Sequence, residues 1–150
     1  MEPGERLTTD QRAIDHRAVW QWLHDDSYWA RGRPWAVQER AVAGSRCFAV
    51  IGPDGDTRAF CRLVTDGATF AWLADVVVLP PFRGRGLGKD LVSAVVGSQH
   101  TTIGIRRLLL RTNDADGLYA QFGFAPVETG FMERVVSDQP EPGRVKAMPD

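Results

Sequence analysis

Residues 75–89 read DVVVLPPFRGRGLGK: an apolar strand ends, two prolines follow, and a glycine-rich loop leads into a helix. Glycines at alternate positions leave backbone N–H groups unblocked by side chains at the helix start. A helix N-terminus carries a positive partial charge and accommodates anions. The loop therefore predicts a phosphate-bearing ligand, held by three glycines and three basic residues: Arg83, Gly84, Arg85, Gly86, Gly88 and Lys89.

Two other phosphate-binding patterns do not match this loop. A P-loop requires a hydroxyl residue after Gly-Lys, whereas Gly88-Lys89 is followed by Asp90. The dinucleotide pattern G-x-G-x-x-G requires a different glycine spacing and an early place in a parallel βαβ unit. A mononucleotide P-loop and a Rossmann loop are both excluded on these grounds.

The rest of the chain predicts a mixed α/β domain over residues 5–136. Three strands before the loop, separated by Gly, Pro and Asp turns, are typical of an antiparallel meander. A strand that follows a helical crossover should lie parallel to the last meander strand. Strands are expected at 6–9, 46–51, 58–65, 69–79, 107–112 and 124–135, and helices at 10–25, 34–44, 86–99 and 115–122; residues 137–150 are expected to form a mobile tail.

Composition narrows the function classes. The chain has 150 residues and a formal net charge of −1, so no basic field favours nucleic acid or an anionic membrane. No signal peptide opens it, and no apolar run approaches the roughly 20 residues of a membrane span, so a soluble, cytoplasmic protein is expected. Cys47 and Cys61 are expected to be buried free thiols, with a disulfide as the alternative.

The motif Arg83-x-x-Gly86-x-Gly88 resembles the acyl-CoA pyrophosphate loop of GNAT-superfamily N-acetyltransferases. Residues 112–124, TNDADGLYAQFGF, resemble the second signature of that family, in which a helix bearing Leu-Tyr precedes Gly-Phe. Residues 27–33 and 65–70 resemble a subgroup of small bacterial and fungal members. The resemblance implies the GNAT fold, a central sheet with two parallel strands that splay apart, and acetyl-CoA as co-substrate without a metal.

The resemblance also implies donor-side roles. The pantetheine arm would pair with the backbone of Val76, Val77 and Val78, and Asn113 could hydrogen-bond it, unless Asn113 or Asp114 only caps the next helix. The pyrophosphate would rest on the amides from Gly84 through Leu87 to Lys89, near Arg83 and Arg85. Tyr119 maps to the proton donor for the departing thiolate, with a core aromatic as the alternative.

The base and the acceptor site are less well defined. The splayed strands lack the Glu that relatives use, so Asp75 is the candidate base, with a raised pKa expected from burial. The alternative is a structural carboxylate. Asp66 is a weaker candidate for the base, since Asp-Gly is also a turn sequence. Acceptor contacts are expected from Tyr28, Trp29, Arg33, Arg62 and Asp66. Arg62 would be a buried charge in need of a carboxylate, and the alternative is a Trp-rich lid with a salt-bridged arginine.

Two functions fit these residues. The first is an N-acetyltransferase that moves an acetyl group from acetyl-CoA to a small-molecule amine. The second is a catalytically inactive acyl-CoA-binding module with a sensory or regulatory role. A homodimer is compatible with either, whereas a nucleic-acid contact through RGRG is excluded because it is not part of a basic stripe.

Overall fold

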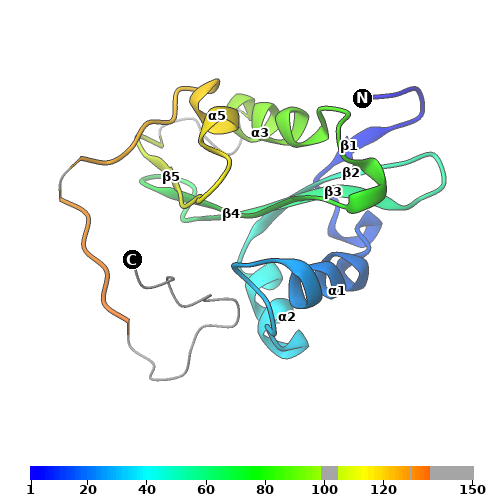
Figure 1. Ribbon diagram of the computed structural model, residues 1–150, viewed down its shortest axis with the longest axis horizontal. Coiled ribbons are helices and arrows are strands. Elements are labelled where there is room, and N and C mark those ends of the chain that lie inside the picture. Colours follow the sequence, from blue (N-terminus) through cyan, green and yellow to red (C-terminus); the bar gives the residue numbers. More distant parts are fainter. Residues whose placement is uncertain (99–104, 129, 136–150) are drawn as a thin grey trace.

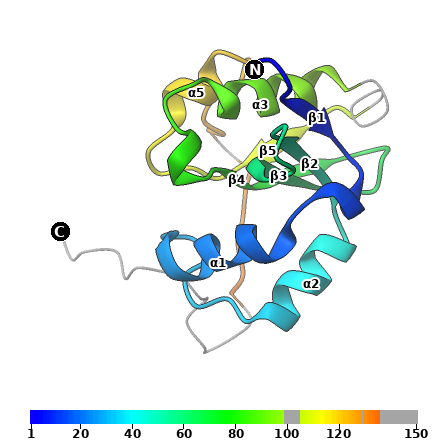
Figure 2. The same ribbon diagram turned by 90° about the vertical axis from the view of Figure 1, so that its right-hand side faces the viewer.

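The computed structural model describes residues 1–98, 105–128 and 130–135. A five-stranded sheet lies between two layers of helices, with α1 and α2 on one face and α3 and α5 on the other (Figures 1 and 2). The α-helices are α1 (His16–Asp26), α2 (Trp35–Ala43), α3 (Leu87–Gly97) and α5 (Asp116–Ala120), and two short 3-10 turns are η1 (Gln11–Ala13) and η2 (Pro80–Phe82). The strands are β1 (Arg6–Thr8), β2 (Arg46–Ile51), β3 (Thr57–Thr65), β4 (Ala71–Val78) and β5 (Leu108–Leu110).

The strands follow the order β1-β2-β3-β4-β5. The first three pairings are antiparallel, and β5 lies parallel to β4 after the crossover through α3. This confirms the predicted mixed sheet. β5 pairs with β4 only over Ala71–Leu73, so the carboxyl half of β4 has no strand partner on that side among the described residues.

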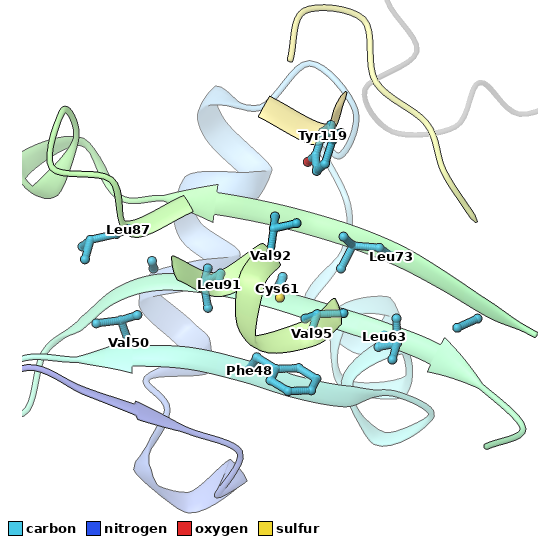
Figure 3. Close-up of a cluster of buried hydrophobic side chains, with 12 residues drawn as sticks. Phe48, Val50, Cys61, Leu63, Leu73, Leu87, Leu91, Val92, Val95 and Tyr119 are labelled. Atoms are coloured by element: carbon cyan, nitrogen blue, oxygen red, sulfur yellow. The ribbon is translucent and has the colours of Figure 1, made fainter. Parts of the chain in front are cut away.

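The core has two halves, one on each face of the sheet. On the α3 face, Leu87, Leu91, Val92 and Val95 recur at helical spacing and pack on Phe48, Cys61, Leu63 and Leu73 (Figure 3). On the other face, Val19 and Leu23 of α1 pack against Phe60, Ile51 and Val77. Each fully buried Leu or Val contributes about 1.5–3 kcal/mol relative to an exposed one, so the sheet is anchored from both sides.

A bulge interrupts β4 at the centre of the sheet. Phe60 pairs with Val77 while Arg62 pairs with Ala74, so Cys61 of β3 faces two residues of β4. One of these two is Asp75, whose φ of 51° lies in the left-handed region that non-glycine residues rarely adopt. The bulge turns the Asp75 side chain toward the α1–α2 face, and this displacement defines the site described below.

Two expectations concern the C-terminal part of the chain, and the structure describes only one of the two segments in part. The strand expected at 124–135 is wrong for the described residues of that segment, which are in no strand. Pro126 has no N–H to donate, Gly130 has a φ of 86°, and Phe131 and Met132 are 60% and 94% exposed, so the segment neither pairs nor buries alternate side chains. The tail expected at 137–150 lies outside the described residues.

The cysteines are free and buried, as expected, with Cys47 in the core half under α1 and Cys61 in the half under α3. Burial raises the pKa of the Cys47 thiol to about 11. Within the described ranges, none of the helices has the length and apolar character needed to cross a membrane.

Candidate active site

A cavity of about 1540 Å³ opens where β4 and β5 diverge. Ligand pockets for one small molecule occupy about 300–1,000 Å³, so this cavity has room for two substrates. It brings together most of the residues that the sequence singled out: Tyr28, Trp29, Arg33, Arg62, Asp75, Val76, Val77, Val78, Arg83, Gly84, Gly86, Leu87, Gly88, Asn113 and Tyr119. Arg85, Lys89 and Asp66 do not line it.

The glycine loop forms one end of the cavity. Gly84 and Gly86 have φ angles of 77° and 81°, a conformation that side chains disfavour. Gly86 caps α3 without any side-chain hydrogen bond, and Asp90 N–H makes a helical bond to its carbonyl. Among the described residues the N–H groups of the first turn of α3 have no acceptor, so they can bind an anion.

Arg85 points away from this anion site. Its guanidinium forms ion pairs with Glu2 at 2.7 Å and with Glu5. The Glu5 carboxylate is completely buried and also accepts from Arg58 at 2.8 Å. The N–H of Glu2, followed by the two arginines, lowers the pKa of Glu5 to about 2. Arg85 thus ties the loop to the N-terminal segment.

The exposed edge of β4 forms a wall of the cavity. Leu79 N–H donates to Arg58 of β3, and backbone groups alternate in direction along a strand. Val76 and Val78 therefore direct their N–H and C=O groups away from β3, toward the gap, whereas those of Val77 face β3. Arg83 Nε donates to the Val78 carbonyl at 2.9 Å.

Tyr119 of α5 reaches the cavity from the α3 side of the sheet (Figure 3). Its ring packs edge-on against Phe124, and the residue is 8% exposed. Within the described part of the chain, no group hydrogen-bonds its hydroxyl. Burial raises the pKa of Tyr119 to about 12, so the phenol stays protonated at neutral pH.

Asp75 is bound by four N–H donors. Its Oδ1 accepts from Trp29 at 2.9 Å and from Arg33 at 3.3 Å, and its Oδ2 accepts from Arg33 at 2.8 Å and from Arg62 at 2.6 Å. Burial acts to raise the pKa of Asp75, but Arg62 and Arg33 outweigh it and the net pKa is lowered. The expected raised pKa is therefore wrong. A carboxylate has about four lone-pair sites, and all four are occupied.

Tyr28 bridges the two sides of the cavity. Its hydroxyl accepts from Asn113 N–H at 3.3 Å and donates to the Asp114 carboxylate at 3.5 Å. The alternative role of Asn113 or Asp114 as the cap of α5 is not observed, because Ala115 is the N-cap residue and no side chain caps this helix.

Asp66 has a different role from the one proposed. It lies in the turn between β3 and β4, where it accepts from the N–H groups of Ala68 and Thr69, both at 2.8 Å. The Thr69 hydroxyl and these N–H groups lower the pKa of Asp66 below its usual range. This carboxylate stabilises a turn, as its Asp-Gly sequence also allowed.

The cluster around Asp75 also contains Gln38 and Ser45, which the sequence does not single out. Gln38 of α2 is 1% exposed and accepts from Arg33 at 2.8 Å, and the Ser45 hydroxyl accepts from Arg62 at 3.3 Å. A polar residue on the buried face of a helix is the one available signal for Gln38. Ser45 follows Gly44 in a turn and carries no such signal.

Comparisons with known proteins agree with this geometry. Residues 43–126 match the family model described as an acetyltransferase (GNAT) domain. A protein from Gibberella zeae assigned to the acetyltransferases is 33% identical over 133 residues, covering 77% of this chain and 75% of the relative.

Two solved structures are also similar. A protein from Xanthomonas campestris pv. campestris, assigned to the GNAT family of acetyltransferases, has a TM-score of 0.85 at 40% identity. The match covers 97% of this chain and 99% of that protein. Rv2747 from Mycobacterium tuberculosis, solved with CoA and NLQ, has a TM-score of 0.66 at 19% identity, covering 82% of this chain and 73% of its own. The latter similarity concerns the fold alone.

Proposed function

Because the chain belongs to the GNAT acetyltransferase family, we propose that it transfers an acetyl group from acetyl-CoA to the amine of a small molecule. The observation that carries this proposal is the shared cavity. It joins an anion-binding helix start, an open strand edge and a protonated tyrosine to a polar pocket on the opposite face of the sheet.

The donor end fits acetyl-CoA. The N–H groups at the start of α3 would hold the pyrophosphate, and Arg83 is the basic residue of the glycine loop that lines the cavity. Val76 and Val78 would pair with the amides of the pantetheine arm through the backbone groups that face the gap. Acetyl-CoA supplies the activated acetyl group.

Tyr119 is the proposed proton donor. In the transfer, the amine nitrogen forms a bond to the acetyl carbon, the bond from that carbon to sulfur breaks, and the sulfur takes up a proton. The Tyr119 hydroxyl is protonated and free of other partners among the described residues, so it can donate to the sulfur and regain a proton from solvent.

Asp75 is not the proposed base. Its lone pairs are occupied and its proton affinity is reduced, so it cannot remove a proton from an amine without losing an arginine contact. We propose that Asp75 positions Trp29, Arg33 and Arg62, and that the amine loses its proton to water in the open cavity.

The test uses CoA release and acetyl-CoA binding together. Free thiol is measured with saturating acetyl-CoA and a panel of amines, and acetyl-CoA affinity is measured by calorimetry. Amine-dependent thiol release with formation of the N-acetyl product supports the proposal. Tight acetyl-CoA binding without turnover on any amine favours the acyl-CoA-binding module instead.

A further inference from the structure

Two arginines and one carboxylate share the wall of the cavity on the α1–α2 face. The side chains of Arg33 and Arg62 are each 14% exposed, and Asp75 is 1% exposed. No other carboxylate in the described ranges forms an ion pair with either arginine. The cluster therefore keeps one positive charge without a counterion, at a place where solvent is largely excluded and charge interactions are strong.

Arg62 has donors to spare. A guanidinium carries five N–H donors. Arg62 uses its Nε on Asp75 and one Nη1 donor on Ser45. The other donors have no acceptor within the described part of the chain, and the side chain lines the cavity.

Arg33 is held firmly beside it. Nη1 of Arg33 donates to both Gln38 and Asp75, and its backbone carbonyl accepts from the Trp20 indole at 2.8 Å. Both guanidiniums are thus oriented before any substrate arrives, which lowers the entropy lost on binding. A planar guanidinium with free donors is suited to a carboxylate.

We infer that the accepted amine carries a carboxylate, which Arg62 binds with the support of Arg33. This inference rests on the proposed function and specifies its substrate class. The surplus of one charge matches a carboxylate, whereas a phosphate monoester would bring close to two negative charges. The substrate carboxylate would be the second counterion of the cluster, so that two arginines would face two carboxylates.

The experiment compares matched amines. The panel contains α-amino acids, β-alanine and 4-aminobutyrate, each beside its carboxamide, together with 2-phenylethylamine and O-phosphoethanolamine. Two properties are measured for each compound: CoA release with saturating acetyl-CoA, and the shift in melting temperature of the CoA-saturated protein. The second readout does not require turnover.

Three variants accompany the panel. Arg62→Gln removes the charge, Arg62→Lys keeps the charge without the planar donors, and Arg40→Gln is a control on the exposed face of α2. If circular dichroism shows that Arg62→Gln is unfolded, Arg62→Lys is compared with the wild type instead. The expected preference of the wild type for the carboxylate over the carboxamide is on the order of 10- to 100-fold. Arg62→Gln should abolish this preference, Arg62→Lys should reduce it, and Arg40→Gln should retain it.

Some results would overturn the inference. These are equal or better use of carboxamides, of 2-phenylethylamine or of O-phosphoethanolamine, a preference that survives Arg62→Gln, or no thermal shift with any carboxylate. If carboxylates stabilise the protein through Arg62 but no amine is acetylated, the carboxylate site at Arg62 stands and the proposed function fails. If amines without a carboxylate are acetylated as readily as those with one, the function stands and the inference fails.

Discussion

Replacing Asp75 by asparagine removes one negative charge from the centre of the protein with little change in shape. Asparagine tolerates the left-handed backbone at this position, so the substitution isolates the charge from the strain at φ 51°. In the variant, Arg33 and Arg62 face an amide and lack their carboxylate. Breaking a buried pair by removal of one partner costs about 3–5 kcal/mol, a large part of the roughly 5–15 kcal/mol that stabilises a typical domain.

The assay is urea unfolding at pH 7, followed by tryptophan fluorescence and circular dichroism. The expected loss of about 3–5 kcal/mol corresponds to a fall in melting temperature of roughly 6–20 °C for a chain of this size. Asp26→Asn is the matched control, because Asp26 is exposed at the end of α1 and its replacement should change stability by less than about 0.5 kcal/mol. A loss below about 1 kcal/mol for Asp75→Asn would refute the view that this carboxylate holds the two arginines.

The ion pairs of Asp75 also predict how the stability of the protein depends on pH. Because the folded pKa of Asp75 is below its unfolded value of about 3.9, its contribution is complete above that value and is lost as the pH falls through the folded pKa. The difference in stability between the wild type and Asp75→Asn should therefore be largest at neutral pH and shrink in acid. An unchanged difference at pH 2 would contradict the assignment.

Three further changes test other parts of the account. Gly88→Trp should abolish acetyl-CoA binding in calorimetry, because Gly88 lines the cavity, while Gly97→Trp, at the open end of the same helix, should bind normally; equal affinity in both would exclude the loop as the pyrophosphate site. Tyr119→Phe should lower kcat by on the order of 100-fold or more while leaving the acetyl-CoA Kd within about twofold, and an unchanged kcat would remove Tyr119 from the mechanism. Glu5→Gln removes the ion pair through which Arg85 ties the loop to the N-terminal segment, so it should weaken acetyl-CoA binding. Since the folded pKa of Glu5 is about 2, this variant should also show a smaller fall in melting temperature than the wild type between about pH 4.3 and 2. A wild-type acid profile in this variant would exclude the ion pair as the link between the two segments.

The sequence predicted the features that depend on local pattern. Alternating apolar residues and Gly or Asp turns located β2, β3 and β4, and the helical spacing from Leu87 to Val95 located α3. The glycine loop predicted an anion site because its conformational requirement is local. These features do not depend on which distant residues come together.

The errors at the site concern distant partners. Nothing in residues 75–89 indicates that Asp75 would meet Arg62 across a bulge and Arg33 from the segment between α1 and α2. The local sequence predicts that Arg85 belongs to the anion site. Its actual partner, Glu5, lies 80 residues earlier in the chain, so nothing near Arg85 indicates that pairing. Burial alone predicts a raised carboxyl pKa, and only the positions of the two arginines reverse it.

The most direct test of the account is mass-spectrometric detection of the acetylated amine in reactions that contain acetyl-CoA and the amine panel. We predict one N-acetyl product for each free thiol formed, at a rate that falls on the order of 100-fold or more in Tyr119→Phe. Acetyl-CoA that binds tightly but yields no acetylated amine with any member of the panel would contradict the claim that this cavity joins a donor site to an acceptor site for transfer.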